Sequence, residues 1–212
     1  ALTRGLNEGG CEVFDLGLCG TEEVYFATQH FAMDGGIAVT ASHNPPDYNG
    51  MKFVREESRP ISGDSGLFEI RDLAAAGEFT LARAVGGMHE LDVRPAYVQH
   101  LLSYIDPASL QPLKIVVDPG NGGAGLVVNA LQPHLPFEFV KIHDQPDGTF
   151  PNGVPNPLLP ENRSATAAAI RESGADFGVA WDGDFDRCFL FDDNGGFIEG
   201  YYIVGLLAEA ML

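Results

Sequence analysis

The sequence predicts an α/β fold made of two consecutive units with mixed or largely parallel sheets. Helix and strand patterns alternate along the chain, and several apolar strand segments end directly in polar or glycine-rich turns. A stretch with little periodicity, residues 77–90, separates two such alternating series and is the expected linker. At 212 residues, 45% of them hydrophobic, the chain is long enough to bury a substantial core.

In the first series, a helix end is followed by Gly9 and Gly10, which are suited to closing it. Thr21 stands at the start of the next helical pattern and is expected to cap it. The short apolar run at 36–39 has the length and composition of a buried strand. The expected elements are a helix at 2–8, a strand at 11–16, a helix at 21–31, strands at 36–40 and 51–54, and a helix at 64–76.

The second series begins near Leu91 and has the same alternation. Residues 145–160 interrupt it with five prolines, so they are expected to form a long loop, a feature that favours a functional role. The expected elements are a helix at 95–105, a strand at 113–118, a helix at 125–131, a strand at 137–142, a helix at 163–172, strands at 177–181 and 188–191, and a helix from residue 200.

The net charge of −18 argues against nucleic acids and anionic membranes as partners, because both would be repelled. With only 12 Lys and Arg residues, an anionic substrate requires a local cationic site. Three cysteines without a CxxC motif, and no signal-peptide pattern, favour a reduced cytoplasmic location. The apolar run at 201–212 is too short for a membrane span and contains Glu209.

Ser42 follows the apolar strand at 36–40 on a turn that also holds His43 and Asn44. A serine there is usually a turn or cap residue. Its polar neighbours favour a second interpretation, in which its hydroxyl is a nucleophile that carries phosphate. Lys52 lies ten residues further on, where it can fold back as a proton carrier or phosphate contact.

Asp182, Asp184 and Asp186 follow another apolar strand at alternate positions. Two unit charges 4 Å apart repel by ~1 kcal/mol in water and by ~4 kcal/mol at an effective dielectric of 20, so converging carboxylates favour a bound cation. The alternative is a solvated acidic turn with splayed side chains. A calcium EF-hand is excluded, because Arg187 and Asp193 stand where Gly and Glu are required. Three oxygen ligands with positions open for phosphate suit Mg²⁺.

Arg187 adjoins these aspartates and can neutralise them, grip phosphate, or do both. Residues 120–125, Gly-Asn-Gly-Gly-Ala-Gly, match the G-x-G-x-x-G pattern of dinucleotide-binding proteins. Asp144 and Asp147 lie near the position expected of a ribose-binding acid. A simple glycine turn is favoured, because a dinucleotide site explains neither Ser42 nor the aspartates.

Residues 40–52, TASHNPPDYNGMK, and 182–187, DGDFDR, resemble the two signature segments of the α-D-phosphohexomutases. The resemblance extends over nearly the whole chain. The segments TEEVYFAT, PDGTFPNGVPNPLLPENR and EGYYIVGLLAEAML are similar to the bacterial phosphomannomutase branch of that family. One departure is Phe185, which stands where many members carry glycine.

The resemblance implies a role for each residue of the two motifs. Ser42 would bear the phosphate and contact Mg²⁺ through it, with the three aspartates as the other metal ligands. His43, Lys52 and Arg187 would surround the transfer site, with Lys52 or His43 as candidate general acid or base. The charges agree with this assignment: three aspartates and a dianionic phosphoserine give −5, and Mg²⁺, Lys52 and Arg187 return +4.

The resemblance also implies a division of the chain. Residues 1–87 would be part of a first domain truncated at its N-terminus, residues 88–196 the second domain, and residues 197–212 the start of a third. The first strand and an active-site arginine would precede Ala1, and the sugar-reading and distal phosphate-binding parts would follow Leu212. The 212 residues alone are therefore expected to lack turnover.

The implied activity is that of a phosphomannomutase, which interconverts mannose 6-phosphate and mannose 1-phosphate through a phosphoserine and a hexose 1,6-bisphosphate. Phosphoglucomutase and phosphoglucosamine mutase remain alternatives, because residues that read the sugar are outside this sequence. Two alternatives of other classes remain open, an NAD-binding dehydrogenase domain and a catalytically silent module that binds metal or phosphate. The oligomeric state is left open.

Overall fold

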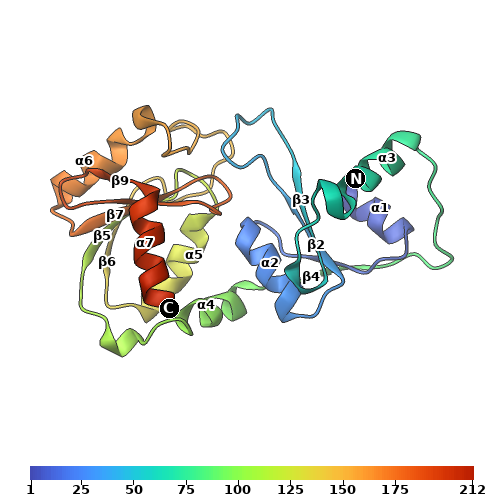
Figure 1. The fold of residues 1–212 in the computed structure, drawn as a ribbon, viewed down its shortest axis with the longest axis horizontal. Helices are drawn as coiled ribbons and strands as arrows, with labels where there is room; N and C mark the ends of the chain where they lie inside the picture. Colours follow the sequence, from blue (N-terminus) through green and yellow to red (C-terminus); the bar gives the residue numbers. More distant parts are fainter.

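The computed structural model describes residues 1–212, except for the side chain of Met211. The helices are α1 (Leu2–Glu8), α2 (Thr21–His30), α3 (Phe68–Ala76), α4 (Arg94–Leu102), α5 (Ala124–Leu131), α6 (Ser164–Ser173) and α7 (Gly200–Met211). The strands are β1 (Val13–Asp15), β2 (Gly35–Val39), β3 (Met51–Arg55), β4 (Met88–Glu90), β5 (Lys114–Asp118), β6 (Glu138–Lys141), β7 (Phe177–Trp181), β8 (Cys188–Phe191) and β9 (Phe197–Ile198). They form two lobes with α2 at the junction (Figure 1).

The second lobe is a five-stranded sheet in the order β6-β5-β7-β8-β9. The first three strands are parallel, and β8 and β9 are added antiparallel. The parallel strands are covered on both faces, because alternate side chains of β5 point to opposite sides. Val116 packs with Ile170 of α6, whereas Ile115 and Val117 pack with Val128 of α5. The predicted α/β class is confirmed here.

The first lobe contains two separate two-stranded sheets. β1 pairs with β4 in parallel, and β2 pairs with β3 in the antiparallel direction. The expectation of largely parallel strands is therefore wrong for β2 and β3, which form a hairpin joined by residues 40–50. A small core lies between this hairpin and α2, and its buried members are Val24, Ala27, Ala38 and Val54.

Several predicted boundaries differ from the structure. The expected linker contains β4, and Met88–Glu90, which we placed at the start of the second unit, pairs with β1 of the first. The expected helix at 64–76 begins with an irregular turn, Gly63–Leu67, because Gly66 has a φ of 124°. The two-residue strand β9 was not predicted.

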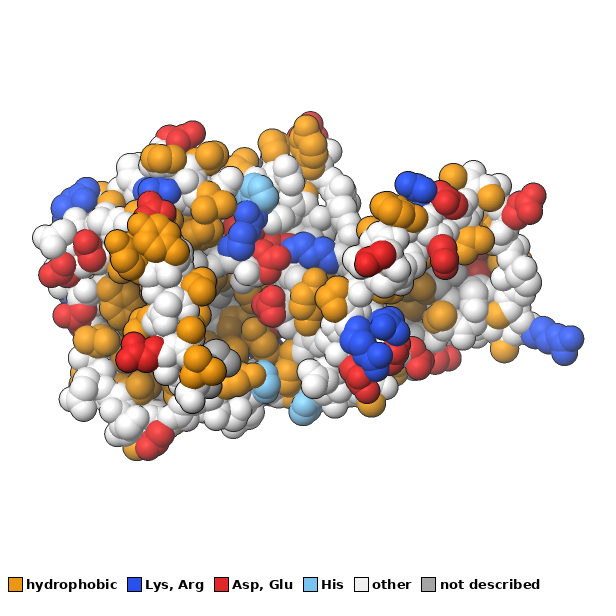
Figure 2. Space-filling view, viewed as in Figure 1, with side chains coloured by type: hydrophobic (Ala, Val, Ile, Leu, Met, Phe, Trp, Pro, Cys, Tyr) orange, Lys and Arg blue, Asp and Glu red, His pale blue; other side chains and the backbone are white. Residues whose placement is uncertain are grey.

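The elements that carry the two motifs end at the junction of the lobes. The β2–β3 loop extends from the first lobe toward the end of β7 in the second (Figure 1). Acidic, basic and histidine side chains gather on the surface between the lobes (Figure 2). The apolar run at 201–212 forms α7, and none of the helices described is long and apolar enough to cross a bilayer.

Candidate phosphoryl-transfer site

Ser42 and Asp182 are in contact although 140 residues separate them in the sequence. The Ser42 hydroxyl donates to Asp182 Oδ2 over 2.8 Å, and the Ser42 N–H donates to Thr40 Oγ1 over 2.8 Å. Ser42 has a φ of 56°, a left-handed conformation that costs a non-glycine residue about 1–2 kcal/mol. This strained turn presents the hydroxyl to Asp182 of the second lobe, and such strain is common at functional sites.

Arg187 and His43 complete the surroundings of the Ser42 hydroxyl. Arg187 Nη2 donates to Ser42 Oγ over 2.8 Å and also contacts Asp182 and His43 Nδ1. The distance from Ser42 Oγ to His43 Nδ1 is 3.1 Å. A guanidinium at this position can hold an anionic group attached to the serine oxygen, because it offers several donors in one plane.

Lys52 reaches the aspartates from β3. Its ammonium lies 2.6 Å from Asp184 Oδ2 and 2.6 Å from Asp186 Oδ2, and it also donates to Thr21 Oγ1 over 3.1 Å. Partial burial tends to lower the pKa of Lys52, but its hydrogen bonds to both aspartates outweigh burial and raise that pKa. Lys52 is therefore protonated at neutral pH.

The three carboxylates converge as the sequence predicts. One oxygen from each of Asp182, Asp184 and Asp186 lies within 4.8 Å of the others. Asp182 is fully buried and Asp184 is 6% exposed, so the alternative of a solvated acidic turn does not describe them. Asp186 is exposed, and its second oxygen lies 3.6 Å from Arg187 Nε.

The buried aspartates differ in how their charge is compensated. Burial raises the pKa of Asp182, and hydrogen bonds from Ser42 and Arg187 only partly oppose this. Burial also acts to raise the pKa of Asp184, but hydrogen bonds from Lys52, Thr21 and Thr40 lower it overall. The charge on Asp184 is thus well supported by the first lobe.

Asp184 also provides the test of whether a cation fits. Its Oδ2 accepts from Thr21, Thr40 and Lys52, whereas its buried Oδ1 has no hydrogen-bond partner among the residues described. A buried carboxylate oxygen left without a donor requires explanation. A bound cation would explain this free oxygen, because the oxygen would then be one of its ligands. Mg²⁺ prefers hard oxygen ligands of this kind.

Thr21 and Thr40 are site residues that our sequence interpretation missed. Thr21 was expected to cap α2, but Gly20 is the cap residue and the Thr21 hydroxyl donates to Asp184 Oδ2 over 2.9 Å. The cap is supplied by Glu23, whose carboxylate accepts the Gly20 N–H. A contact across 163 residues leaves no local signal in the sequence, although Thr40 lies inside the recognised motif.

The glycine-rich turn at 120–125 supports the metal loop. Gly123 N–H donates to Gly183 O over 3.0 Å, so the backbone donor at the start of α5 is already used. A Cβ at Gly122 would lie 2.5 Å from Gly183 O, and one at Gly125 would lie 2.0 Å from Asp144 O. These close approaches explain the glycines without a dinucleotide.

Comparisons with known proteins agree with this arrangement. A family model described as phosphoglucomutase/phosphomannomutase, alpha/beta/alpha domain I, matches residues 1–81, and the corresponding domain II model matches residues 95–196. A Xanthomonas campestris protein described as phosphohexose mutases is 64% identical over 212 residues, and a Salmonella montevideo phosphomannomutase is 60% identical over 219 residues. Both matches cover all of this chain but only 47% and 48% of the relatives, so the chain spans about half their length.

The fold has a close counterpart among solved structures. The crystal structure of a phosphoglucomutase/phosphomannomutase family protein from Burkholderia thailandensis superimposes with a TM-score of 0.90 at 34% sequence identity. That match covers 100% of this chain and 46% of the other. Since the two domain models together account for most of the residues, the chain belongs to the phosphoglucomutase/phosphomannomutase family.

Proposed function

We propose that this chain carries the phosphoryl-transfer site of a phosphomannomutase, which interconverts mannose 6-phosphate and mannose 1-phosphate. The observation that carries the proposal is the hydrogen bond from the Ser42 hydroxyl to buried Asp182, which joins the two motifs across the two lobes. The similarity to relatives named phosphomannomutase supports the choice of sugar. In this cycle, phosphorylated Ser42 gives its phosphoryl group to the sugar, and a hexose 1,6-bisphosphate gives one back.

Ser42 is the proposed nucleophile and phosphate carrier. Arg187 donates to its oxygen and is placed to bind the phosphate that the oxygen would carry. Holding the reacting groups in place and compensating their charge accounts for most catalysis of phosphoryl transfer. The strained turn serves this role, because it fixes the direction of the hydroxyl before substrate arrives.

Lys52 and His43 are the proposed proton carriers. Lys52 is protonated at neutral pH because of its two aspartate partners, so it is suited to donating a proton or a hydrogen bond. His43 Nδ1 lies 3.1 Å from Ser42 Oγ, within hydrogen-bond reach of the group that gains and loses phosphate. Lys52 thus contacts Asp184 and Asp186, whereas His43 contacts the Ser42 hydroxyl, so the two are suited to complementary roles.

Asp182, Asp184 and Asp186 are the proposed ligands of Mg²⁺, with the phosphate on Ser42 as a further ligand. When bound, Mg²⁺ draws charge from the phosphoryl group during transfer. The buried free oxygen of Asp184 and the convergence of the three carboxylates support this proposal. Thr21 and Thr40 orient Asp184 by donating to its other oxygen.

The expected setting follows from the same proposal. The substrate would be a hexose phosphate in the cytoplasm, and the acidic chain would use Lys52 and Arg187 as its local cationic groups. The matched family includes phosphoglucomutases, so glucose phosphates are the principal competing substrates.

Intact-mass measurement tests the proposal. The full natural chain that contains these residues is incubated with mannose 1,6-bisphosphate or glucose 1,6-bisphosphate, and we expect the gain of one phosphoryl group on Ser42. Ser42→Ala should gain none, whereas Ser62→Ala, which removes an exposed serine, should behave as the unmodified protein. Phosphorylation mapped to another residue would contradict the assignment, and the faster donor identifies the sugar.

A further inference from the structure

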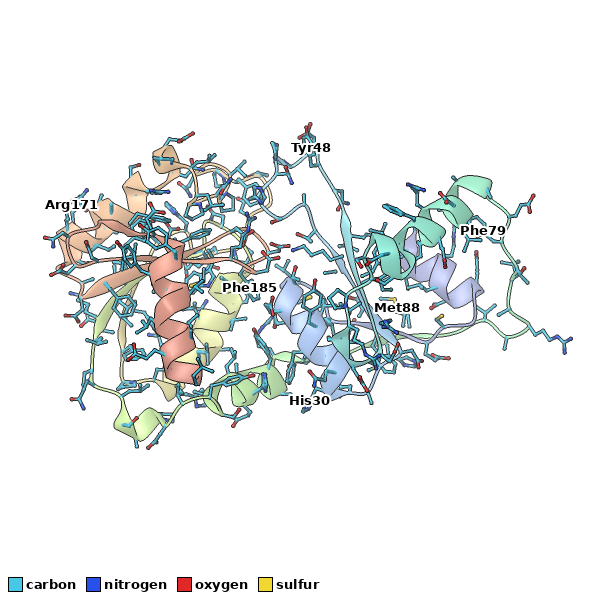
Figure 3. The ribbon with its side chains drawn as sticks, viewed as in Figure 1. His30, Tyr48, Phe79, Met88, Arg171 and Phe185 are labelled. Atoms are coloured by element: carbon cyan, nitrogen blue, oxygen red, sulfur yellow. The ribbon has the colours of Figure 1, made fainter. Side chains whose placement is uncertain are left out.

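Phe185 stands between two of the aspartates, and its ring is almost completely buried. It is 9% exposed and packs with Tyr97, Ala124 and Val127 of the second lobe. Phe26 of α2, from the first lobe, packs against the same cluster. Figure 3 shows Phe185 between α2 and α5, so this ring lies at the contact between the lobes.

Two glycines, one from each lobe, make room for this ring. A Cβ at Gly20 would lie 2.1 Å from two ring atoms of Phe185, and a Cβ at Gly123 would lie 3.0 Å from the ring. Gly20 has φ −93° and ψ 172°, an extended conformation open to any residue. Glycine at position 20 is therefore required by the ring and not by the backbone. We call Gly20 and Gly123 the glycine socket.

The backbone around Phe185 points to the same constraint. Phe185 has a φ of 49°, a left-handed conformation that favours glycine. A phenylalanine at this position therefore carries a cost in backbone conformational energy. Its neighbour Asp184 accepts two hydrogen bonds from Thr21, one from the N–H over 3.2 Å and one from the hydroxyl over 2.9 Å. The ring and these hydrogen bonds hold the same first turn of α2.

Both walls of the socket are anchored. On the first lobe, Gly20 N–H donates to Glu23, which is fully buried and paired with Arg94 Nε at 3.2 Å. On the second lobe, Gly123 N–H donates to Gly183 O within the metal loop. A ring lodged between two anchored walls sets the spacing between them.

We propose that Phe185 is a positioning residue: its ring in the glycine socket sets the distance between α2 and the metal loop, and so holds Asp184 in place for the cation. The proposal rests on the metal site of the proposed function. Its particular claim is that cation affinity depends on how the ring fits the socket, in addition to any effect on overall stability.

A double-mutant cycle in the 212-residue chain tests this claim, with Mn²⁺ binding followed by electron paramagnetic resonance. Mn²⁺ takes carboxylate oxygen ligands as Mg²⁺ does. Gly20→Ala adds a methyl group that meets the ring, and Phe185→Gly removes the ring, so each should raise the Kd for Mn²⁺ at least about tenfold. The double variant should bind no more weakly than Phe185→Gly alone, because the methyl group no longer meets a ring.

Three controls make the cycle decisive. Gly148→Ala adds a methyl group where no described atom lies within 4 Å, and it should leave the Kd unchanged. Phe185→Leu keeps an apolar group in the socket and should restore most of the affinity that Phe185→Gly loses. Each Kd is measured at a temperature where circular dichroism shows the variant folded. If Gly20→Ala does not fold, the comparison of Phe185→Gly with Phe185→Leu still tests whether the cation affinity requires an apolar side chain in the socket.

The outcomes separate this inference from the function on which it rests. Absence of Mn²⁺ binding by the unmodified chain would count against the metal site and against both proposals. Normal binding by Phe185→Gly, or additive losses in the double variant, would overturn the positioning role alone and leave the metal site intact.

Discussion

The two lobes differ in how well their cores are packed and in which residues of the candidate site they carry. The second lobe has a continuous five-stranded sheet, and Val116, Ile170 and Phe191 in its core are fully buried. The first lobe has two separate two-stranded sheets, and large apolar side chains such as Leu73 and Phe79 remain exposed. The well-packed lobe supplies the aspartates, and the loosely packed lobe supplies Ser42 and Lys52.

This difference indicates how the site is held. The aspartates follow β7, a central strand whose position the surrounding core fixes. The Ser42 turn has little core of its own, so its position depends on contacts across the junction with Asp182 and Arg187. The position of Ser42, the proposed nucleophile, is therefore expected to follow that of the second lobe. The predictions below test this division.

The largest expected effect concerns Ser42, the proposed nucleophile. In the full natural chain, Ser42→Gly should lower mutase turnover on the order of 10³-fold or more, because the proposed phosphate carrier is lost. The same change should alter the free energy of unfolding by no more than about 1 kcal/mol, because glycine relieves the left-handed strain while the hydrogen bond to Asp182 is lost. Coupled assays and urea unfolding measure the two quantities, with Ser62→Gly as control. Turnover near that of the unmodified protein would disprove the assignment of Ser42.

The second prediction compares the cores. Ile170→Ala removes a fully buried side chain from the second lobe and should cost about 2–5 kcal/mol of stability. Leu73→Ala in the first lobe changes a side chain that is 62% exposed and should stay within about 0.5 kcal/mol. Urea unfolding of the 212-residue chain measures both. Equal losses would show that the two lobes are packed to a similar degree.

The third prediction concerns the cation. Mg²⁺ at a hundredfold excess over its Kd should raise the free energy of unfolding by about 2.7 kcal/mol, because it binds only the folded chain. Asp184→Asn should abolish this gain, since it removes a carboxylate whose free oxygen is buried. Asp193→Asn, which alters an exposed aspartate outside the cluster, should keep it. An equal gain in both variants would place the cation elsewhere.

Local parts of this arrangement could be predicted from the sequence. The strands at 177–181 and 188–191 and the helix at 2–8 have the predicted bounds, because each is a short periodic run closed by turn residues. The three aspartates were expected to converge because they alternate after a buried strand. The motif residues Ser42 and Lys52 were expected near them, and the structure brings all of them together.

The remaining features depend on contacts between distant segments. β4 is only three residues long, and it is a strand because β1 offers a partner about 75 residues earlier. Thr21 resembles an ordinary cap until Asp184 is brought beside it. Gly20 resembles a turn residue until the ring of Phe185 occupies the adjacent space. Sequence periodicity reports on burial along one element and contains no information on such pairings.

The smallest expected effect is the pH dependence of the ion pair that joins the lobes. Asp184 has a pKa below its ordinary 3.8, so its contribution to stability is present above pH 3.8 and is lost as the pH falls through the folded-state value. Lys52 has a pKa above its ordinary 10.5, so its contribution is present below pH 10.5 and is lost as the pH rises through the folded-state value. The pair therefore stabilises the folded chain across the whole neutral range.

Lys52→Met should lower the free energy of unfolding by about 1–2 kcal/mol at neutral pH, since it leaves buried Asp184 without its cationic partner. The difference between the two proteins should stay level between about pH 5 and pH 9 and shrink toward both extremes. Burial gives Asp182 the opposite shift, but that effect is common to both proteins and largely cancels in the difference. Lys114→Met, which breaks a more exposed pair with Glu138, should cost less than about 1 kcal/mol. A Lys52 difference that stays unchanged at both pH extremes would mean that the stability lost comes from apolar packing and not from this ion pair.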